Sequence, residues 1–166
     1  MRVGVASFEQ VADPLHAVEA AAEALQWACL REAGSELLLA APLEGLDVQL
    51  SVQWLAEEGL LQISATWDMR VPAARRRTVA ELVQLVNPHL PLGHFELWED
   101  TGTVIFRHAQ MIGDGQAPDE EQARGLLQRV AAACGRYHPA FQFVLWAGKS
   151  PREALRACMF DTVGEA

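Results

Sequence analysis

The chain has 166 residues, of which 22 are acidic and 13 are basic, so its formal net charge is -9. Hydrophobic residues make up 51% of the chain and charged residues 21%, which indicates one globular domain over residues 1–166 and excludes an intrinsically disordered protein. Because the negative charge repels phosphate backbones and anionic lipid surfaces, we expect no nucleic acid and no membrane among its partners.

The first residues and the cysteines indicate a cytoplasmic protein. No apolar run approaches the roughly 18 uncharged residues that span a bilayer, and the segment MRVGVASFEQVADP lacks the long apolar stretch of a signal peptide. Cys29, Cys134 and Cys158 are odd in number, lie far apart and match no metal-ligand spacing, which suits reduced thiols. We therefore expect a cytoplasmic location and neither a cofactor nor a metal.

The N-terminal half predicts one helix followed by a run of strands. Asp13 and Pro14 form a helix start, and apolar residues recur at helical spacing up to Leu25. Four segments are predicted as strands: 28–32, 36–41, 46–55 and 60–69. The last two alternate between apolar and polar residues, the pattern of half-buried antiparallel strands.

The next segment predicts a helix and a β-hairpin. After Pro72, five apolar residues form one helical stripe that Asn87-Pro88 disrupts: Val79, Leu82, Val83, Val86 and Leu90. The strands 94–99 and 103–111 flank the loop Asp100-Thr101-Gly102, whose glycine suits the left-handed position of a tight turn.

A long helix from Pro118 and a short final helix complete the chain. We expect Pro139 to kink or break the long helix, because its ring meets the carbonyl of Gly135 four residues earlier. Ser150 and Pro151 begin the final helix. The element order α-β(3 to 4)-α-β-β-α predicts an α+β fold in which helices cover one face of an antiparallel sheet.

No motif of a catalytic or phosphate-binding site is present in the sequence. Gly148-Lys149-Ser150 matches the end of a P-loop, but the rest of that motif is missing. The end of one helix and the start of the next explain these three residues better. We therefore assign no catalytic residue and expect no enzyme.

The predicted hairpin carries the strongest candidate cluster. If its loop pairs Glu99 with Thr103, then His94 lies opposite His108, with Glu96 on the same face. Two imidazoles and a carboxylate could hold a metal, but no third strong ligand is evident. The favoured interpretation is that both histidines make ordinary hydrogen bonds to the backbone or a carboxylate. The alternative is a metal or small-ligand sensor.

Two other groups of residues are candidates for binding. Arg75, Arg76 and Arg77 open the second helix, where positive charge opposes the helix dipole. Pairing with Glu81 and nearby strand carboxylates is the favoured interpretation, and a dock for an anion or an acidic partner is the alternative. The core is the favoured interpretation for Trp54, Trp67, Trp98 and Trp146, and a protein interface is the alternative for some of them.

Two long segments resemble a known family. LGHFELWEDTGTVIFRHAQM and RYHPAFQFVLWAGKSPREAL resemble the C-terminal half of bacterial YbjN-domain proteins, described as "putative sensory transduction regulators". VPAARRRTVAELVQLVNPHL and the strand pair ending in Trp54 and Trp67 fit the same family, so the resemblance covers about residues 14–160. Where relatives tend to have two glycines before KSP, this chain has Ala147-Gly148.

The resemblance implies a fold similar to type III secretion chaperones, with molecules that often associate in pairs. It implies no catalytic residue and no cofactor. The leading hypothesis is a regulatory protein that acts through protein–protein contacts and forms a homodimer, and a secretion-chaperone-like role is an alternative. The candidate interaction surface comprises six residues: Arg75, Arg76, His94, Glu96, Trp98 and His108.

Overall fold

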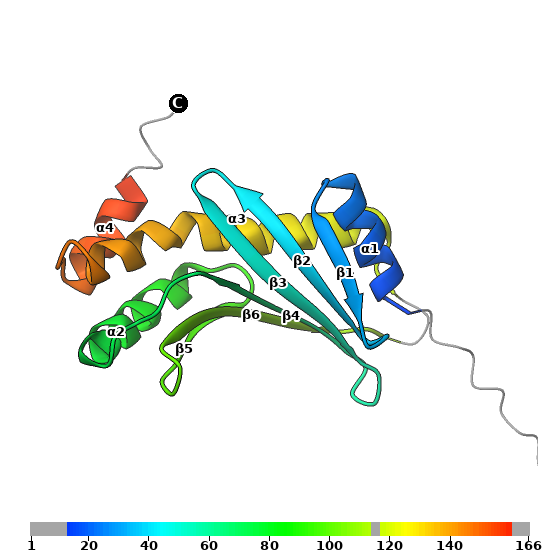
Figure 1. The fold of residues 1–166 in the computed structure, drawn as a ribbon, viewed down its shortest axis with the longest axis horizontal. Coiled ribbons are helices and arrows are strands. Elements are labelled where there is room, and N and C mark those ends of the chain that lie inside the picture. Colours follow the sequence, from blue (N-terminus) through cyan, green and yellow to red (C-terminus); the bar gives the residue numbers. More distant parts are fainter. Residues whose placement is uncertain (1–12, 114–116, 161–166) are drawn as a thin grey trace, which may run out of the picture.

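The structure is a computed structural model and describes residues 13–113 and 117–160 (Figure 1). The strands are β1 (Ala28–Glu32), β2 (Glu36–Leu43), β3 (Leu46–Leu55), β4 (Leu60–Trp67), β5 (His94–Trp98) and β6 (Thr103–Met111). The helices are α1 (Leu15–Ala24), α2 (Arg76–Val86), α3 (Glu120–Leu145) and α4 (Pro151–Phe160), with short 3-10 turns η1 (Ala73–Arg75) and η2 (Asn87–His89) at the two ends of α2. The predicted α+β class is confirmed.

The strands form one six-stranded antiparallel sheet in the order β1-β2-β3-β4-β6-β5. The first four strands follow one another as a meander, because each connection between them is a short turn. The chain then leaves the sheet through α2 and returns to the far side of β6 as β5, so that β4 pairs with β6. The edges of the sheet are therefore β1 and β5.

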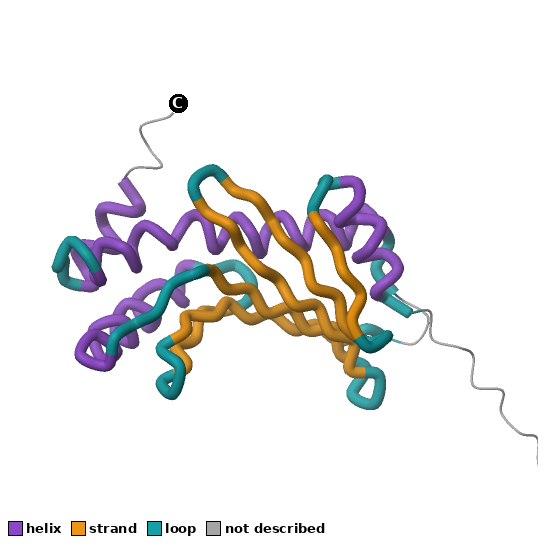
Figure 2. Tube along the Cα trace, in the orientation of Figure 1, coloured by secondary structure: helices purple, strands orange, loops and turns teal. Residues whose placement is uncertain are grey.

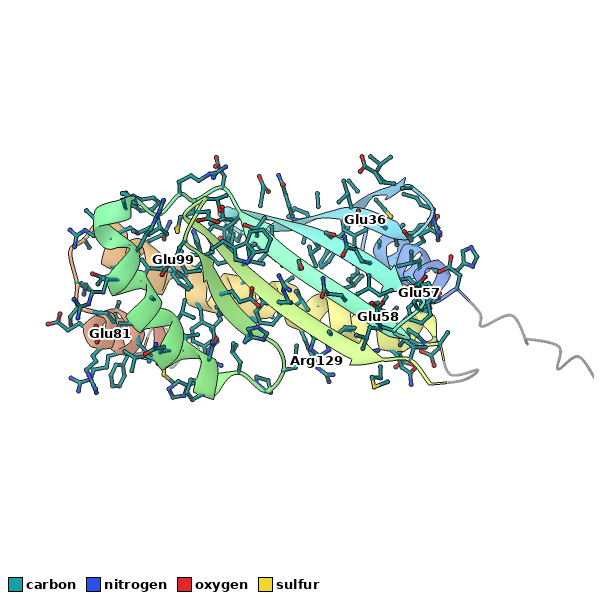
Figure 3. All side chains as sticks on the ribbon, turned by 90° about the horizontal axis from the view of Figure 1, so that it is seen from below. Glu36, Glu57, Glu58, Glu81, Glu99 and Arg129 are labelled. Atoms are coloured by element: carbon teal, nitrogen blue, oxygen red, sulfur yellow. The ribbon has the colours of Figure 1, made fainter. Side chains whose placement is uncertain are left out.

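The long helix α3 passes behind β2 and β3 in Figure 1, where β4 to β6 lie below it, and it lies behind the sheet in Figure 3; Figure 2 shows the strands as one twisted layer. Alternate strand residues such as Leu50, Ile63 and Phe106 point toward the helices and are fully buried. Helix α1 is tied to the edge strand by Arg31, whose guanidinium binds Glu19 at 2.8 Å and Asp13 at 3.1 Å. The helices therefore cover one face of the sheet, as the alternating strand patterns predict.

The helix starts follow the predicted capping residues. Asp13 Oδ1 accepts a hydrogen bond from the backbone N–H of Leu15 at 3.0 Å. Ser150 and Glu153 exchange hydrogen bonds at the start of α4, which satisfies backbone donors that have no partner within the helix. Gly148, just before this start, has a φ of +65°, the left-handed conformation expected where a helix ends.

The expected break at Pro139 does not occur, because α3 is continuous from Glu120 to Leu145. Buried residues on both sides of the proline, including Cys134 and Phe141, pack against the sheet. This packing offsets the hydrogen bond that proline cannot make. Gly135 lets α3 approach β2 closely, since a Cβ atom there would lie 3.1 Å from Leu43 Cδ1.

The predicted register of the β5–β6 hairpin is wrong by one residue. Trp98, not Glu99, pairs with Thr103, so the loop has one residue more than expected and His94 lies opposite Arg107. Packing explains the difference, because the observed register pairs Phe95 with Phe106 in the core, with ring centroids 5.2 Å apart. The predicted register would have placed the Phe106 ring on the uncovered face.

Candidate functional site

The face of the sheet turned away from α3, which we call the open face, carries the broadest candidate site. Outward positions on the inner strands are mostly small or uncharged polar residues, such as Gln49, Ser51, Ser64 and Thr66. A hollow of about 460 Å³ lies over this face and is lined by residues of β1, β2, β3, β4 and β6. The sheet therefore has one face that builds the core and one that is free to bind.

Apolar side chains line much of the hollow. Leu30 on β1 is 59% exposed and Leu38 on β2 is 37% exposed, and these two residues are paired across the strands. Ala40 and Ile105 add further apolar surface to the hollow. Exposed apolar surface that lines a hollow is typical of binding sites, whereas single exposed apolar residues are common on any protein.

The polar part of the open face is joined by hydrogen bonds. Ser51 Oγ donates to Glu36 Oε1 at 2.5 Å, and Gln53 Nε2 donates to the same oxygen at 3.2 Å. Gln62 Nε2 in turn donates to Gln53 Oε1 at 3.5 Å. Among the described residues, no cation lies within 4 Å of the Glu36 carboxylate, so the network leaves its negative charge on the surface.

Three of the predicted residues come together on the open face at β5. Glu96 binds His94 Nε2 through Oε1 at 2.8 Å and accepts a hydrogen bond from Trp98 Nε1 through Oε2 at 3.1 Å. Arg107 Nε lies 3.4 Å from Glu96 Oε1, and its guanidinium carbon is 5.9 Å from the centre of the Trp98 ring. We call these four residues the Glu96 cluster.

Opposing effects set the charge state of Glu96. Burial alone would raise the pKa of this carboxyl, but the hydrogen bonds from His94 and Trp98 and the charge of Arg107 outweigh burial and lower the pKa below its ordinary value. Glu96 therefore stays ionised and holds the exposed Trp98 in place. The cluster thus presents the exposed ring of Trp98 beside the opposite charges of Glu96 and Arg107.

His108 does not join this cluster, which corrects the predicted histidine pair. Since His94 pairs with Arg107, the adjacent His108 points to the opposite face. There it lines a second cavity of about 470 Å³ with Arg129 of α3. No group of three or more metal-ligating side chains occurs within residues 13–113 and 117–160. The metal sensor that required His94 beside His108 therefore loses its geometric basis.

The arginines at the start of α2 lack the predicted partner. No ion pair joins Arg75, Arg76 or Arg77 to Glu81 or to any other described carboxylate within 4 Å. Arg76 is partly buried, and its Nε atom has no hydrogen-bond partner in the described part of the chain. The hydrogen bonds and ion pairs of the Glu96 cluster in the described residues include neither Arg75 nor Arg76.

The leucines of the hollow were missed by the sequence analysis. The run ELLLAA predicts a strand but not which of its leucines faces out, because apolar residues occupy both faces. The sequence signal for such a site is an edge hairpin with apolar residues on both faces, because apolar and polar residues normally alternate along the strands of an antiparallel sheet with one solvated face. Trp54 and Trp67 belong to the core side as expected, whereas Trp98 is 46% exposed and Trp146 is 70% exposed.

Comparison with known proteins gives the family. A sequence profile of the YbjN family, described as "Putative bacterial sensory transduction regulator", matches residues 14–143. The chain belongs to the YbjN family. A search of curated proteins finds no match to the chain.

A solved YbjN structure has the same fold. The crystal structure of YbjN from E. coli, described as "a putative transcription regulator", aligns with a TM-score of 0.51 and 13% sequence identity, and the alignment covers 72% of this chain and 84% of that chain. At this identity the comparison supports the fold and no particular site. Within the chain, the YbjN-like segment 92–111 forms the β5–β6 hairpin that carries the Glu96 cluster. No helix within the described ranges is long and apolar enough to cross a bilayer.

Proposed function

We propose that this YbjN-family chain is a cytoplasmic, non-enzymatic regulator that binds another protein on the open face of its sheet. The observation that supports the proposal is the apolar hollow, with Leu30 and Leu38 exposed on a face that none of the described helices covers. The hollow is broad and largely apolar, whereas enzyme sites depend on converging titratable groups. The family description as a regulator agrees with a binding role.

The proposal is tested by purifying the tagged protein from its native cells and identifying co-purified proteins by mass spectrometry. Leu38→Glu places a charge in the hollow and should remove at least one specific partner. Phe160→Glu is the matched control, since Phe160 is 73% exposed on α4 and does not line the hollow. A partner lost from both variants, or from neither, contradicts docking on the open face.

A further inference from the structure

Acidic residues gather at both ends of the strands that line the hollow. At one end lie Glu32 and Glu36, which are paired across β1 and β2, and Glu57 and Glu58 in the β3–β4 turn. At the other end lie Glu44 and Asp47 around the β2–β3 turn, Asp68 after β4, and Glu99 with Asp100 in the β5–β6 loop. In Figure 3, which looks onto the open face, Glu36, Glu57 and Glu58 appear toward one end of the sheet and Glu99 toward the other.

These carboxylates have no cationic partners in the described residues. None of the nine takes part in an ion pair, since the ion-paired carboxylates of the described residues are Asp13, Glu19 and Glu96. Arg107 is the one arginine or lysine at an outward position of β1 to β6, and its charge is directed at Glu96. Arg70, beside the β5–β6 loop, donates to the Thr101 carbonyl at 3.0 Å and forms no ion pair with any described carboxylate. The nine carboxylates outnumber these two arginines, so the field over the hollow is negative, in keeping with the net charge of -9.

The distance between the acidic ends sets the length of what they can bind. β3 has 10 residues, and a strand rises about 3.4 Å per residue, so the two ends are roughly 30 Å apart. About nine residues of extended chain, or about 20 residues of helix, cover that distance. The middle of such a segment would lie on the Leu30–Leu38 pair and its ends near the carboxylates.

We infer that the partner presents a segment with apolar residues in its middle and lysine or arginine at both ends. This inference rests on the proposed function and specifies the chemistry of the partner. Apolar contact with the hollow supplies affinity, and the two acidic ends set orientation and speed association. An acidic segment or another copy of this acidic face would be repelled.

Three fluorescein-labelled peptides probe this chemistry by fluorescence anisotropy with the full-length protein. The first has alternating leucine and alanine between paired lysines, KKLALALAKK. The second replaces the lysines by glutamates, and the third replaces the central residues by serine and glycine. The lysine–leucine peptide should bind at least tenfold more tightly than either of the others. Its affinity should fall when salt is raised from about 0.05 M to 0.3 M, which shortens the screening length.

Two pairs of variants locate the binding of the lysine–leucine peptide. Leu38→Ser should weaken binding about tenfold, whereas Phe160→Ser should leave it unchanged. The double variant Glu57→Lys with Glu58→Lys should also weaken binding about tenfold. Its control, Glu23→Lys with Glu121→Lys, changes the net charge equally at exposed positions on α1 and α3. Circular dichroism confirms that each variant is folded before binding is measured.

The outcomes separate this inference from the proposed function. Tight binding of the lysine–leucine peptide that both open-face variants weaken, with both controls unaffected, supports the inference. Equal binding of the lysine and glutamate peptides that only Leu38→Ser weakens overturns the inference but leaves docking on the open face intact. Failure of all three peptides to bind, or an equal loss in test and control variants, also overturns the inference. The proposed function is then decided by the co-purification experiment alone.

Discussion

At the scale of single residues, Gly102 fixes the hairpin that carries the Glu96 cluster. Its φ is +69°, its N–H donates to the Trp98 carbonyl at 2.7 Å, and its carbonyl accepts from the Val71 N–H at 2.7 Å. A Cβ atom at this position would lie 2.4 Å from the Val71 carbonyl oxygen. We predict that Gly102→Ala lowers the free energy of unfolding by at least about 2 kcal/mol, from left-handed strain plus the backbone clash.

Gly45 provides a matched control for that substitution. Its φ is +72°, but nothing lies within 4 Å of a Cβ atom built on it. Gly45→Ala should therefore cost only the backbone strain, about 1 kcal/mol. Urea denaturation followed by circular dichroism measures both variants. Equal losses of stability would mean that contact with Val71 does not hold the hairpin loop.

His138 on α3 makes stability depend on pH. Burial lowers the pKa of this imidazole, whose ring lies edge-on to Trp67 with centroids 5.6 Å apart. Above about pH 6.5, the ordinary value for histidine, the ring is neutral in both the folded and unfolded states. Below that pH the unfolded chain takes up the proton first, so stability falls until the pH reaches the lowered pKa of the folded state.

We therefore predict a weaker pH dependence in His138→Phe. Between pH 7 and 5.5, the free energy of unfolding should fall less in the variant than in the wild type. The difference between the two slopes should be at most about 1.4 kcal/mol per pH unit, the contribution of one proton. Denaturation at pH 8, where the imidazole is neutral in both states, gives the packing cost of the substitution separately. If the two pH profiles run parallel, His138 does not carry this dependence.

At the scale of elements, local patterns predicted β3 and β4 because each of these strands has one buried face. The alternation in 46–55 gave β3 its observed bounds, and Asn87-Pro88 marked the end of α2. The predicted strand 60–69 ends earlier, at Trp67. Such patterns are visible in sequence because burial repeats with the period of the element.

Contacts between distant segments account for what the sequence did not predict. The β5–β6 register follows from the packing of Phe95 on Phe106, and its loop is held by Val71, which binds Gly102 from 31 positions earlier in the chain. That one-residue difference separates His108 from His94 and brings Arg107 to Glu96. Likewise, α3 continues through Pro139 because buried residues hold it on both sides. The sequence thus identified three members of the Glu96 cluster but not the fourth.

At the scale of the whole molecule, the edge strand β1 is a candidate contact for the homodimer expected from the sequence. No strand of the described residues pairs with its outer side, and Arg31, on the inner face of β1, binds Glu19 of α1. Unpaired backbone groups at a sheet edge favour pairing with another strand. Two copies of β1 in antiparallel pairing about Leu30 would place Glu32 of each copy opposite Ala28 of the other, so no like charges face each other. Such a contact would be symmetric, as most homodimer contacts are.

We predict that sedimentation velocity over a range of concentrations shows a monomer–dimer equilibrium that Leu30→Lys shifts to the monomer. In the paired arrangement, the two introduced lysines would face each other across the symmetry axis, where like charges are destabilising. Leu38→Lys adds the same charge to the same face one strand away from the edge, and it should leave the equilibrium unchanged. Dimers that dissociate equally in both variants would place the contact over the hollow instead of at the β1 edge. A wild-type chain that stays monomeric at high concentration would contradict the homodimer itself.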